Sequence, residues 1–176
     1  GILMGSRDSW NDYLKDIVTL GLSLPGLIYA LVAVLFFGLS LWAPVTAILA
    51  TSYPFVAVNI REGVKAISKE LLEMSHVYQV KRWKVVSQII LPSLLPFALA
   101  GFRLGFAIAW KVSTLVEVFG AVNGIGWQIR ASFDAFSVHG MLAWTLLFGL
   151  VMLFIEYGIL LPLERYLGRW RPKIAI

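Results

Sequence analysis

The sequence of 176 residues contains no cysteine and only two histidines, His76 and His139. Without cysteine the chain can form no disulfide bond, no thiolate metal site and no thiol nucleophile. The two histidines lie far apart in the sequence, whereas the histidine ligands of a metal site are usually closely spaced. We therefore expect no metal ion bound to this chain.

Charged residues are also scarce: they make up 14% of the chain, against 59% hydrophobic residues. A soluble domain of this size would have too little polar surface to cover itself. Residues 17–60 contain no charged residue, and as one helix they would extend roughly 66 Å, about twice the hydrocarbon thickness of a bilayer. This run must therefore fold back, and we expect the turn at Gly38–Pro44, where Trp42 suits a membrane interface.

Two further uncharged runs follow, at residues 85–102 and 140–155. The sequence thus predicts an all-α membrane protein in which residues 1–176 form a single transmembrane domain. We expect about four crossings, at Tyr13–Phe37, Val45–Ile60, Leu91–Leu115 and Gly140–Leu161. Pro25 should kink the first crossing. A buried core helix is the alternative for any one run, but several such runs in one short chain favour crossings.

Basic residues flank these crossings unequally. The loop after the second crossing, at about residues 61–90, carries Arg61, Lys65, Lys69, Lys81, Arg82 and Lys84. The C-terminal tail carries Arg165, Arg169, Arg171 and Lys173. The loop between the third and fourth crossings has only Arg130. The positive-inside rule places both basic segments, and the N-terminal end, in the cytoplasm. This bias explains the net charge of +5, so no nucleic-acid partner is expected.

The basic loop contains a short amphipathic helix. Ser68 is expected to be its N-cap, and Glu70 in the first turn meets the positive end of the helix dipole. Leu71, Met74, Ser75 and Tyr78 follow at i, i+3, i+4 and i+7 and share one face, with Leu72 beside it. Such a helix could lie on lipid. Anionic lipid would repel Glu70 and Glu73, however, and an apolar tip between charges also suits a groove of a partner protein. The helix taken alone leaves both interpretations open.

The segment from Glu73 to Pro92 resembles the E-A-A-x3-G-x9-I-x-L-P motif of permease subunits of ATP-binding-cassette importers. Glu73, Ile89, Leu91 and Pro92 match the motif, whereas Met74, Ser75 and Gln79 replace its Ala, Ala and Gly. In that family the segment is a cytoplasmic helix-turn-helix that docks into the ATPase. The resemblance therefore implies these ATPase-coupling residues: Glu70, Leu71, Leu72, Glu73, Met74, Ser75, Tyr78 and Gln79. A Gly at position 79 would adopt a left-handed conformation easily, whereas Gln pays on the order of 1 kcal/mol.

The resemblance extends over nearly the whole chain and is strongest to the nitrate/sulfonate/taurine branch of these permeases. It is carried in order by Leu24-Pro25, Phe37-Gly38, Gly63, Ile67, Pro92, Pro96, Gly101–Leu104, Ala109-Trp110, Val116-Glu117 and Gly124–Gly126. It implies a type I importer permease fold, multi-pass in the bacterial inner membrane. Members are usually longer at the N-terminus by roughly two helices, and this chain begins without Met, so we expect it to lack those helices.

The resemblance also implies a function and a set of partners. The chain would be a permease subunit, not an enzyme, that forms the pathway for a small anion such as nitrate, a sulfonate or bicarbonate. A solute-binding protein would deliver the solute, and a second permease subunit, as a homodimer, would complete the pathway. Separate ATPase subunits would bind ATP and magnesium, because this chain has no P-loop and needs no cofactor of its own.

Ionisable residues at membrane depth are costly and therefore mark candidate sites. Arg103 and Lys111 in the third crossing, and Glu117 near its outer end, are candidates for the translocation pathway, although helix geometry prevents all of them from sharing one narrow face. Arg103 and Glu117 match family positions, whereas the branch generally has a neutral residue at Lys111. A cation there would favour an anionic solute, but an interhelical ion pair is equally allowed. Arg103 and Glu156, in the fourth crossing, could instead snorkel or pair with other helices.

The outer loop from Phe119 to Arg130 is rich in turn signals, above all Asn123-Gly124. By resemblance it lies at the external mouth, where the solute-binding protein docks. The Gly124-Ile-Gly126 sequence is not a phosphate cradle, because no strand precedes it and a third glycine is missing. Two other functions stay open: an ATP-independent channel or secondary carrier, and a membrane scaffold that recruits a cytoplasmic partner. The channel or carrier alternative leaves the motif spacing from Glu73 to Pro92 unexplained.

Overall fold

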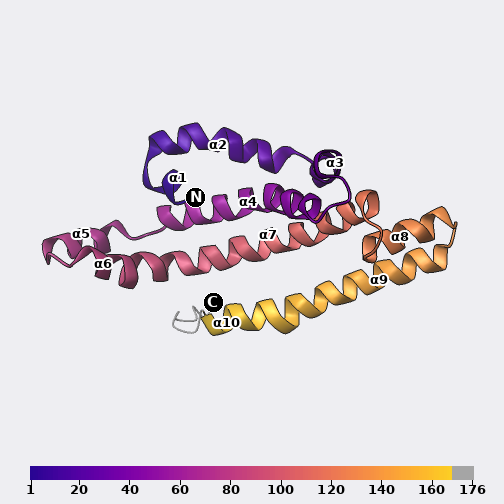
Figure 1. Ribbon diagram of the computed structural model, residues 1–176. Coiled ribbons are helices and arrows are strands. Elements are labelled where there is room, and N and C mark those ends of the chain that lie inside the picture. Colours follow the sequence, from indigo (N-terminus) through magenta and orange to yellow (C-terminus); the bar gives the residue numbers. More distant parts are fainter. Residues whose placement is uncertain (168–176) are drawn as a thin grey trace. The chain divides into compact units, whose positions relative to one another are not determined.

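The computed structural model describes residues 1–167, and all the regular structure in that range is helical (Figure 1). The helices are α1 (Ile2–Ser6), α2 (Asp8–Ser23), α3 (Gly26–Phe37), α4 (Trp42–Lys65), α5 (Lys69–Val77), α6 (Arg82–Val85), α7 (Leu91–Gly120), α8 (Ile125–Asp134), α9 (Val138–Ile155) and α10 (Leu161–Leu167). The all-α expectation is confirmed. Arg169, Arg171 and Lys173, part of the expected basic tail, lie outside the described residues.

Within residues 1–167, three helical stretches are long and apolar enough to cross a membrane: Trp42–Lys65, Arg82–Gly120 and Val138–Leu167. They contain the second, third and fourth expected crossings. The first expected crossing is divided, because α2 ends at Ser23 and α3 begins at Gly26. It would be a fourth span only if the two helices count together. The expected kink at Pro25 is thus a complete break, since proline lacks the N–H that would continue the helix and clashes with the preceding turn.

The basic loop is shorter than the 61–90 predicted from the sequence. Residues 61–65 belong to α4, and α6 continues from Arg82 through a π turn at Val86–Ile90 into α7. A second π turn, Glu156–Leu160, joins α9 to α10. Pro92 and Pro162 each follow such a turn by two residues. Because a proline cannot donate to the carbonyl four residues earlier, a local change to wider hydrogen bonding lets the helix continue.

The chain forms two compact units, which are described separately. The first comprises Gly1–Ser23 and Tyr53–Gly105. Its helices approach closely at glycines: a Cβ on Gly63 would lie 2.8 Å from the Phe97 Cβ, and one on Gly101 would lie 3.2 Å from the Val56 Cα. Small residues permit such close approach between membrane helices. The Tyr53 hydroxyl also donates a hydrogen bond of 3.2 Å to the Ile17 carbonyl, which ties α4 to α2.

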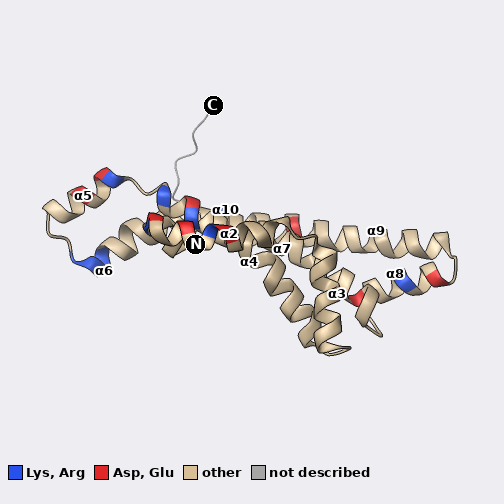
Figure 2. Cartoon of the chain, turned by 90° about the horizontal axis from the view of Figure 1, so that it is seen from above, with Lys and Arg blue, Asp and Glu red and all other residues tan. Residues whose placement is uncertain are grey.

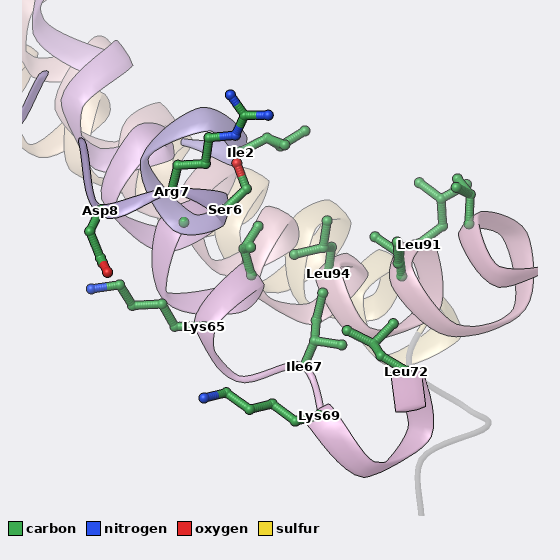
Figure 3. Close-up of a pocket in the computed structure, with 14 residues that line it drawn as sticks. Ile2, Ser6, Arg7, Asp8, Lys65, Ile67, Lys69, Leu72, Leu91 and Leu94 are labelled. Carbon is green, nitrogen blue, oxygen red and sulfur yellow. The ribbon is translucent and has the colours of Figure 1, made fainter. Parts of the chain in front are cut away.

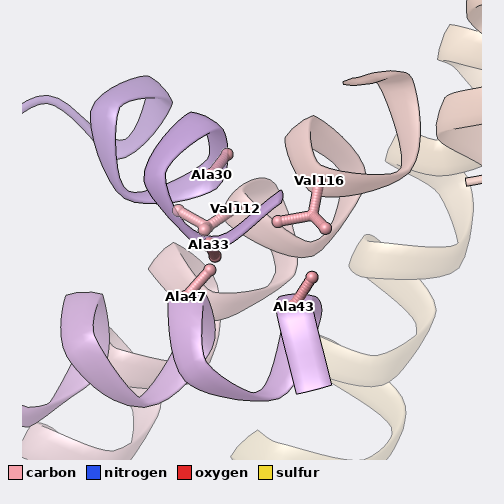
Figure 4. Close-up of a cluster of buried hydrophobic side chains, with 6 residues drawn as sticks. All are labelled: Ala30, Ala33, Ala43, Ala47, Val112 and Val116. Atoms are coloured by element: carbon pink, nitrogen blue, oxygen red, sulfur yellow. The ribbon is translucent and has the colours of Figure 1, made fainter. Parts of the chain in front are cut away.

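The second unit comprises Leu24–Ser52 and the described residues from Phe106 onward. Its core brings together small side chains of α3, α4 and α7 (Figure 4): Ala30, Ala33, Ala43, Ala47, Val112 and Val116. Gly38, at a φ of +60°, ends α3 and starts the expected turn into α4. Further along the chain, Trp110 on α7 stacks on Phe148 on α9 at 5.4 Å. No residue of α9 is buried, which suits a helix covered by lipid or by another membrane helix.

Candidate coupling helix and translocation pathway

Helix α5 begins at the cap that the sequence predicted. The Ser68 Oγ accepts a hydrogen bond of 3.3 Å from the Leu71 N–H. Glu70 occupies the first turn, where its negative charge is favourable for the helix dipole. A short helix of nine residues is marginal by propensity alone, so this cap helps it to form in a polar loop.

The end of α5 shows what Gln79 does at the glycine position of the motif. Its φ of +51° is left-handed, so Gln79 adopts the conformation that a glycine would take easily. The Gln79 N–H donates to the His76 carbonyl at 3.0 Å, and the Val80 N–H donates to the Ser75 carbonyl at 2.9 Å. These two bonds form a Schellman motif, which satisfies carbonyls left free at the helix end. The chain then reverses into α6, so a helix-turn-helix forms although Gln replaces Gly.

The surface of α5 differs in part from the expected stripe. Leu71, Met74 and Tyr78 are exposed, but Ser75 is only 8% exposed and its hydroxyl donates to the Leu72 carbonyl at 2.7 Å. Val77, which the sequence analysis missed, is 77% exposed. The exposed apolar face therefore comprises Leu71, Met74, Val77 and Tyr78, an arc of about 120° at 100° per residue. The spacing of three residues from Met74 to Val77 was a signal that could have found it.

Leu72 points the other way. It lines a cavity of about 970 Å³ in the first unit, formed by α1, the connection between α4 and α5, and the start of α7 (Figure 3). The wall is apolar at Ile67, Leu91 and Leu94, and Arg7, Asp8, Lys65 and Lys69 also line it. Leu72 thus contributes to the packing of α5 within its own unit. Glu70 and Glu73 are exposed, and Figure 2 shows Lys and Arg at the starts of α5 and α6.

The pathway candidates on α7 have different surroundings. Arg103 is half-buried in the first unit. Lys111, in the second unit, is exposed and makes no hydrogen bond or ion pair within the part of the chain that the structure describes. Glu117 is half-buried, and its Oε2 accepts a hydrogen bond of 2.8 Å from the Gly126 N–H. Lys111 is therefore the candidate whose charge remains available to a solute or another subunit.

The expected outer loop is largely a helix. Only residues 121–124 are irregular, because α8 starts at Ile125 and is capped by Gly124 at a φ of +104°. The sequence analysis missed α8, although Arg130 and Asp134 form an i, i+4 ion pair with 2.9 Å between the Arg130 Nε and Asp134 Oδ2. Such pairs are typical of exposed helix surfaces. Across residues 1–167, no three His, Asp or Glu side chains lie close enough together to hold a metal ion.

Comparison with known proteins gives the family. The profile of the binding-protein-dependent transport system inner membrane components matches residues 1–161. The chain is 25% identical over 174 residues to the taurine transport system permease protein TauC of Escherichia coli, covering 99% of this chain and 63% of TauC. It is 28% identical over 171 residues to the putative aliphatic sulfonates transport permease protein SsuC of Bacillus subtilis, covering 97% of this chain and 62% of SsuC.

A third relative is the formylaminopyrimidine transport permease protein ThiX of Halalkalibacterium halodurans. It is 26% identical over 178 residues, which cover 98% of this chain and 70% of ThiX. The chain thus spans less than two thirds of the length of TauC and of SsuC. The family match and the long apolar helices together make it a multi-pass protein of the bacterial cytoplasmic membrane. The chain belongs to the family of inner membrane components of binding-protein-dependent transport systems, the permeases of ATP-binding-cassette importers.

Proposed function

We propose that the chain forms part of the translocation pathway of an importer for a small sulfonate-like anion and is driven by a separate ATPase through α5. The observation that carries this proposal is the exposed apolar face of a capped helix beside charged residues. Leu71, Met74 and Tyr78 are 44%, 51% and 75% exposed. Exposure of these apolar side chains to water is unfavourable, and a groove in a partner protein would cover them.

The charges around this face favour a protein partner over lipid. Glu70 and Glu73 are exposed on the same helix, and anionic lipid would repel both. A basic group beside the groove of an ATPase could instead form a charge-assisted hydrogen bond with Glu73, which is stronger than a bond between neutral groups. The Schellman motif at Gln79 holds α5 as a defined helix, so little ordering would be needed on binding.

Lys111 supports an anionic solute. It lies on a membrane-spanning helix, it is exposed, and no partner in the described residues neutralises it. An uncompensated cation at membrane depth is costly, so it is kept where a water-filled pathway or an opposite charge meets it. TauC and SsuC are named for taurine and for aliphatic sulfonates, which carry an anionic sulfonate group. Nitrate and bicarbonate are smaller alternatives, which carry one negative charge as the sulfonate group does.

The proposal includes the partners that such an importer requires. A second copy of the permease would complete the pathway within the lipid bilayer, and a solute-binding protein would deliver the solute. ATP and magnesium would bind to the ATPase subunits and not to this chain, which needs no cofactor. Closure of the ATPase pair would move α5 and switch the pathway between inward and outward access.

The test is reconstitution of the full-length permease in liposomes with its ATPase, its binding protein and either taurine or nitrate. We expect uptake that requires ATP and the ATPase and that favours the sulfonate. Uptake of the same size without the ATPase would support the channel or carrier alternative. Association with the ATPase but no uptake of any anion would support the scaffold alternative.

A further inference from the structure

Helix α8 starts without a side-chain cap of its own. The first N–H groups of any helix lack partners within the helix, and Ser, Thr, Asp or Asn at the N-cap usually accepts from one of them. The N-cap of α8 is Gly124, which has no side chain to offer. A side-chain acceptor for these N–H groups can therefore come only from another residue of the fold.

Glu117 on α7 supplies an acceptor for the start of α8. Its Oε2 lies 2.8 Å from the backbone nitrogen of Gly126, the second residue of α8. This is the N–H that an N-cap side chain would usually reach. The negative charge of a carboxylate at this position also complements the positive end of the helix dipole, and a hydrogen bond to a carboxylate is stronger than one to a neutral acceptor.

The glycines around this contact show how closely α8 approaches α7. A Cβ on Gly126 would clash with the Thr114 carbonyl oxygen and would lie 2.6 Å from the Glu117 Cβ and 3.1 Å from the Val118 nitrogen. A Cβ on Gly124 would clash with the Glu117 Oε2, and the φ of +104° already disfavours a side chain there. The Thr114 carbonyl oxygen and the Val118 nitrogen are backbone atoms of α7 and cannot move aside. The start of α8 thus lies directly on the backbone of α7.

We propose that Glu117 is a positioning residue that fixes α8 on the outer end of α7, and that it acts as a hydrogen-bond acceptor rather than as a charge in the pathway. Helix α8 leads into α9 and lies beside it (Figure 1). The connection contains Phe136, which is 93% exposed at a φ of +52°. Through its bond to Gly126, Glu117 determines where this exposed connection lies.

Two conservative variants separate the roles of reach and charge. Glu117→Gln keeps an acceptor oxygen at the same distance but removes the charge. Glu117→Asp keeps the charge but is one methylene shorter, by about 1.5 Å, which takes its oxygens beyond hydrogen-bond distance of the Gly126 nitrogen. A positioning role predicts that Gln is tolerated and Asp is harmful. A pathway charge predicts the reverse.

The experiment uses the full-length permease in its membrane complex. This chain has no cysteine, so once any cysteines elsewhere in the full-length permease have been replaced, spin labels can be attached at Phe119→Cys on α7 and Phe133→Cys on α8, both of which are exposed. With the labelled permease diluted into unlabelled permease, so that distances within one copy dominate, we expect one narrow distance distribution for the unsubstituted Glu117 and for Gln, and a broad one for Asp. ATP-driven uptake should fall by no more than about threefold for Gln, which loses only the contribution of the charge at the helix end. It should fall about tenfold for Asp, which is the effect on an equilibrium that loss of one helix cap can have.

Loss of uptake in Glu117→Gln with an unchanged narrow distance would overturn the proposal and restore Glu117 to the pathway. A narrow distance in Glu117→Asp would also overturn it. If the Asp variant does not accumulate in the membrane, the Gln variant alone still decides between the two roles. The uptake measurement rests on the proposed function, whereas the distance measurement does not. Absence of uptake by the unsubstituted complex would therefore refute the function and leave the test of Glu117 intact.

Discussion

Replacement of Gln79 by glycine should stabilise the end of the coupling helix. Gln79 has a φ of +51°, a conformation in which the Cβ of any residue other than glycine approaches the following carbonyl oxygen. The backbone bonds of this turn, from Gln79 to His76 and from Val80 to Ser75, do not involve the Gln79 side chain. Gln79→Gly therefore removes a steric cost without removing a contact of the turn.

The size of the effect follows from two opposing terms. Relief of the left-handed conformation is worth about 1–2 kcal/mol. The greater backbone freedom of glycine in the unfolded loop costs roughly 0.5–1 kcal/mol. The midpoints of these two ranges differ by about 0.75 kcal/mol, so the equilibrium constant for local opening of the turn should fall about three- to fourfold.

Amide hydrogen exchange is the appropriate measurement, because the Gln79 and Val80 N–H groups both donate within the turn. Their protection should rise in Gln79→Gly by the factor given above. Tyr78 provides the matched control, since its φ of −80° is accessible to any residue and glycine there adds only freedom. Tyr78→Gly should therefore lower protection of the same two amides.

Equal protection in Gln79→Gly and the unsubstituted chain would refute the reasoning, because the left-handed conformation would then carry no cost at this position. Lower protection in Gln79→Gly, together with lower protection in Tyr78→Gly, would show that chain freedom decides the stability of the turn. In either case the steric explanation for the glycine of the motif would not apply to this chain.

Three further predictions concern coupling, solute and topology. Glu73→Lys and Tyr78→Asp should each weaken association with the ATPase by about tenfold or more, because Glu73 on α5 and Tyr78 at its C-cap are both exposed and a charge buried without a partner is costly. An ATPase pull-down with a membrane-insertion control measures this. Lys111→Ala should raise the KM for the anion by about tenfold while assembly stays normal, since a hydrogen bond to a charged group is worth roughly 1.5–3 kcal/mol. Lys111→Arg should restore the original KM, and wild-type uptake by Lys111→Ala would exclude Lys111 from the site. A single cysteine at Lys69 should react only with a cytoplasmic reagent and one at Arg130 only with an external reagent, and external labelling at position 69 in intact cells would contradict the topology.

Local features of the structure followed from the sequence. The apolar runs predicted the long helices, Ser68 predicted the start of α5, and the motif predicted a turn near Gln79, where the structure has a left-handed residue. Each of these depends on residues within a few positions of one another, through a hydrogen bond, a φ angle or the thickness of a bilayer. The same local reasoning failed where weak signals competed, as at Pro25, where α2 and α3 are separate helices, and at α8, whose turn-rich start hid a helix.

The roles of individual side chains depended on the tertiary structure. Nothing in the spacing of α5 shows that Ser75 and Leu72 turn inward while Val77 is exposed, because that depends on which neighbours cover the helix. The sequence gives Glu117 a charge at membrane depth, but its bond to Gly126 arises only because α8 folds back against the α7 backbone. A helical pattern specifies which residues share a face, whereas burial and pairing are set by the packing of segments that the pattern does not relate.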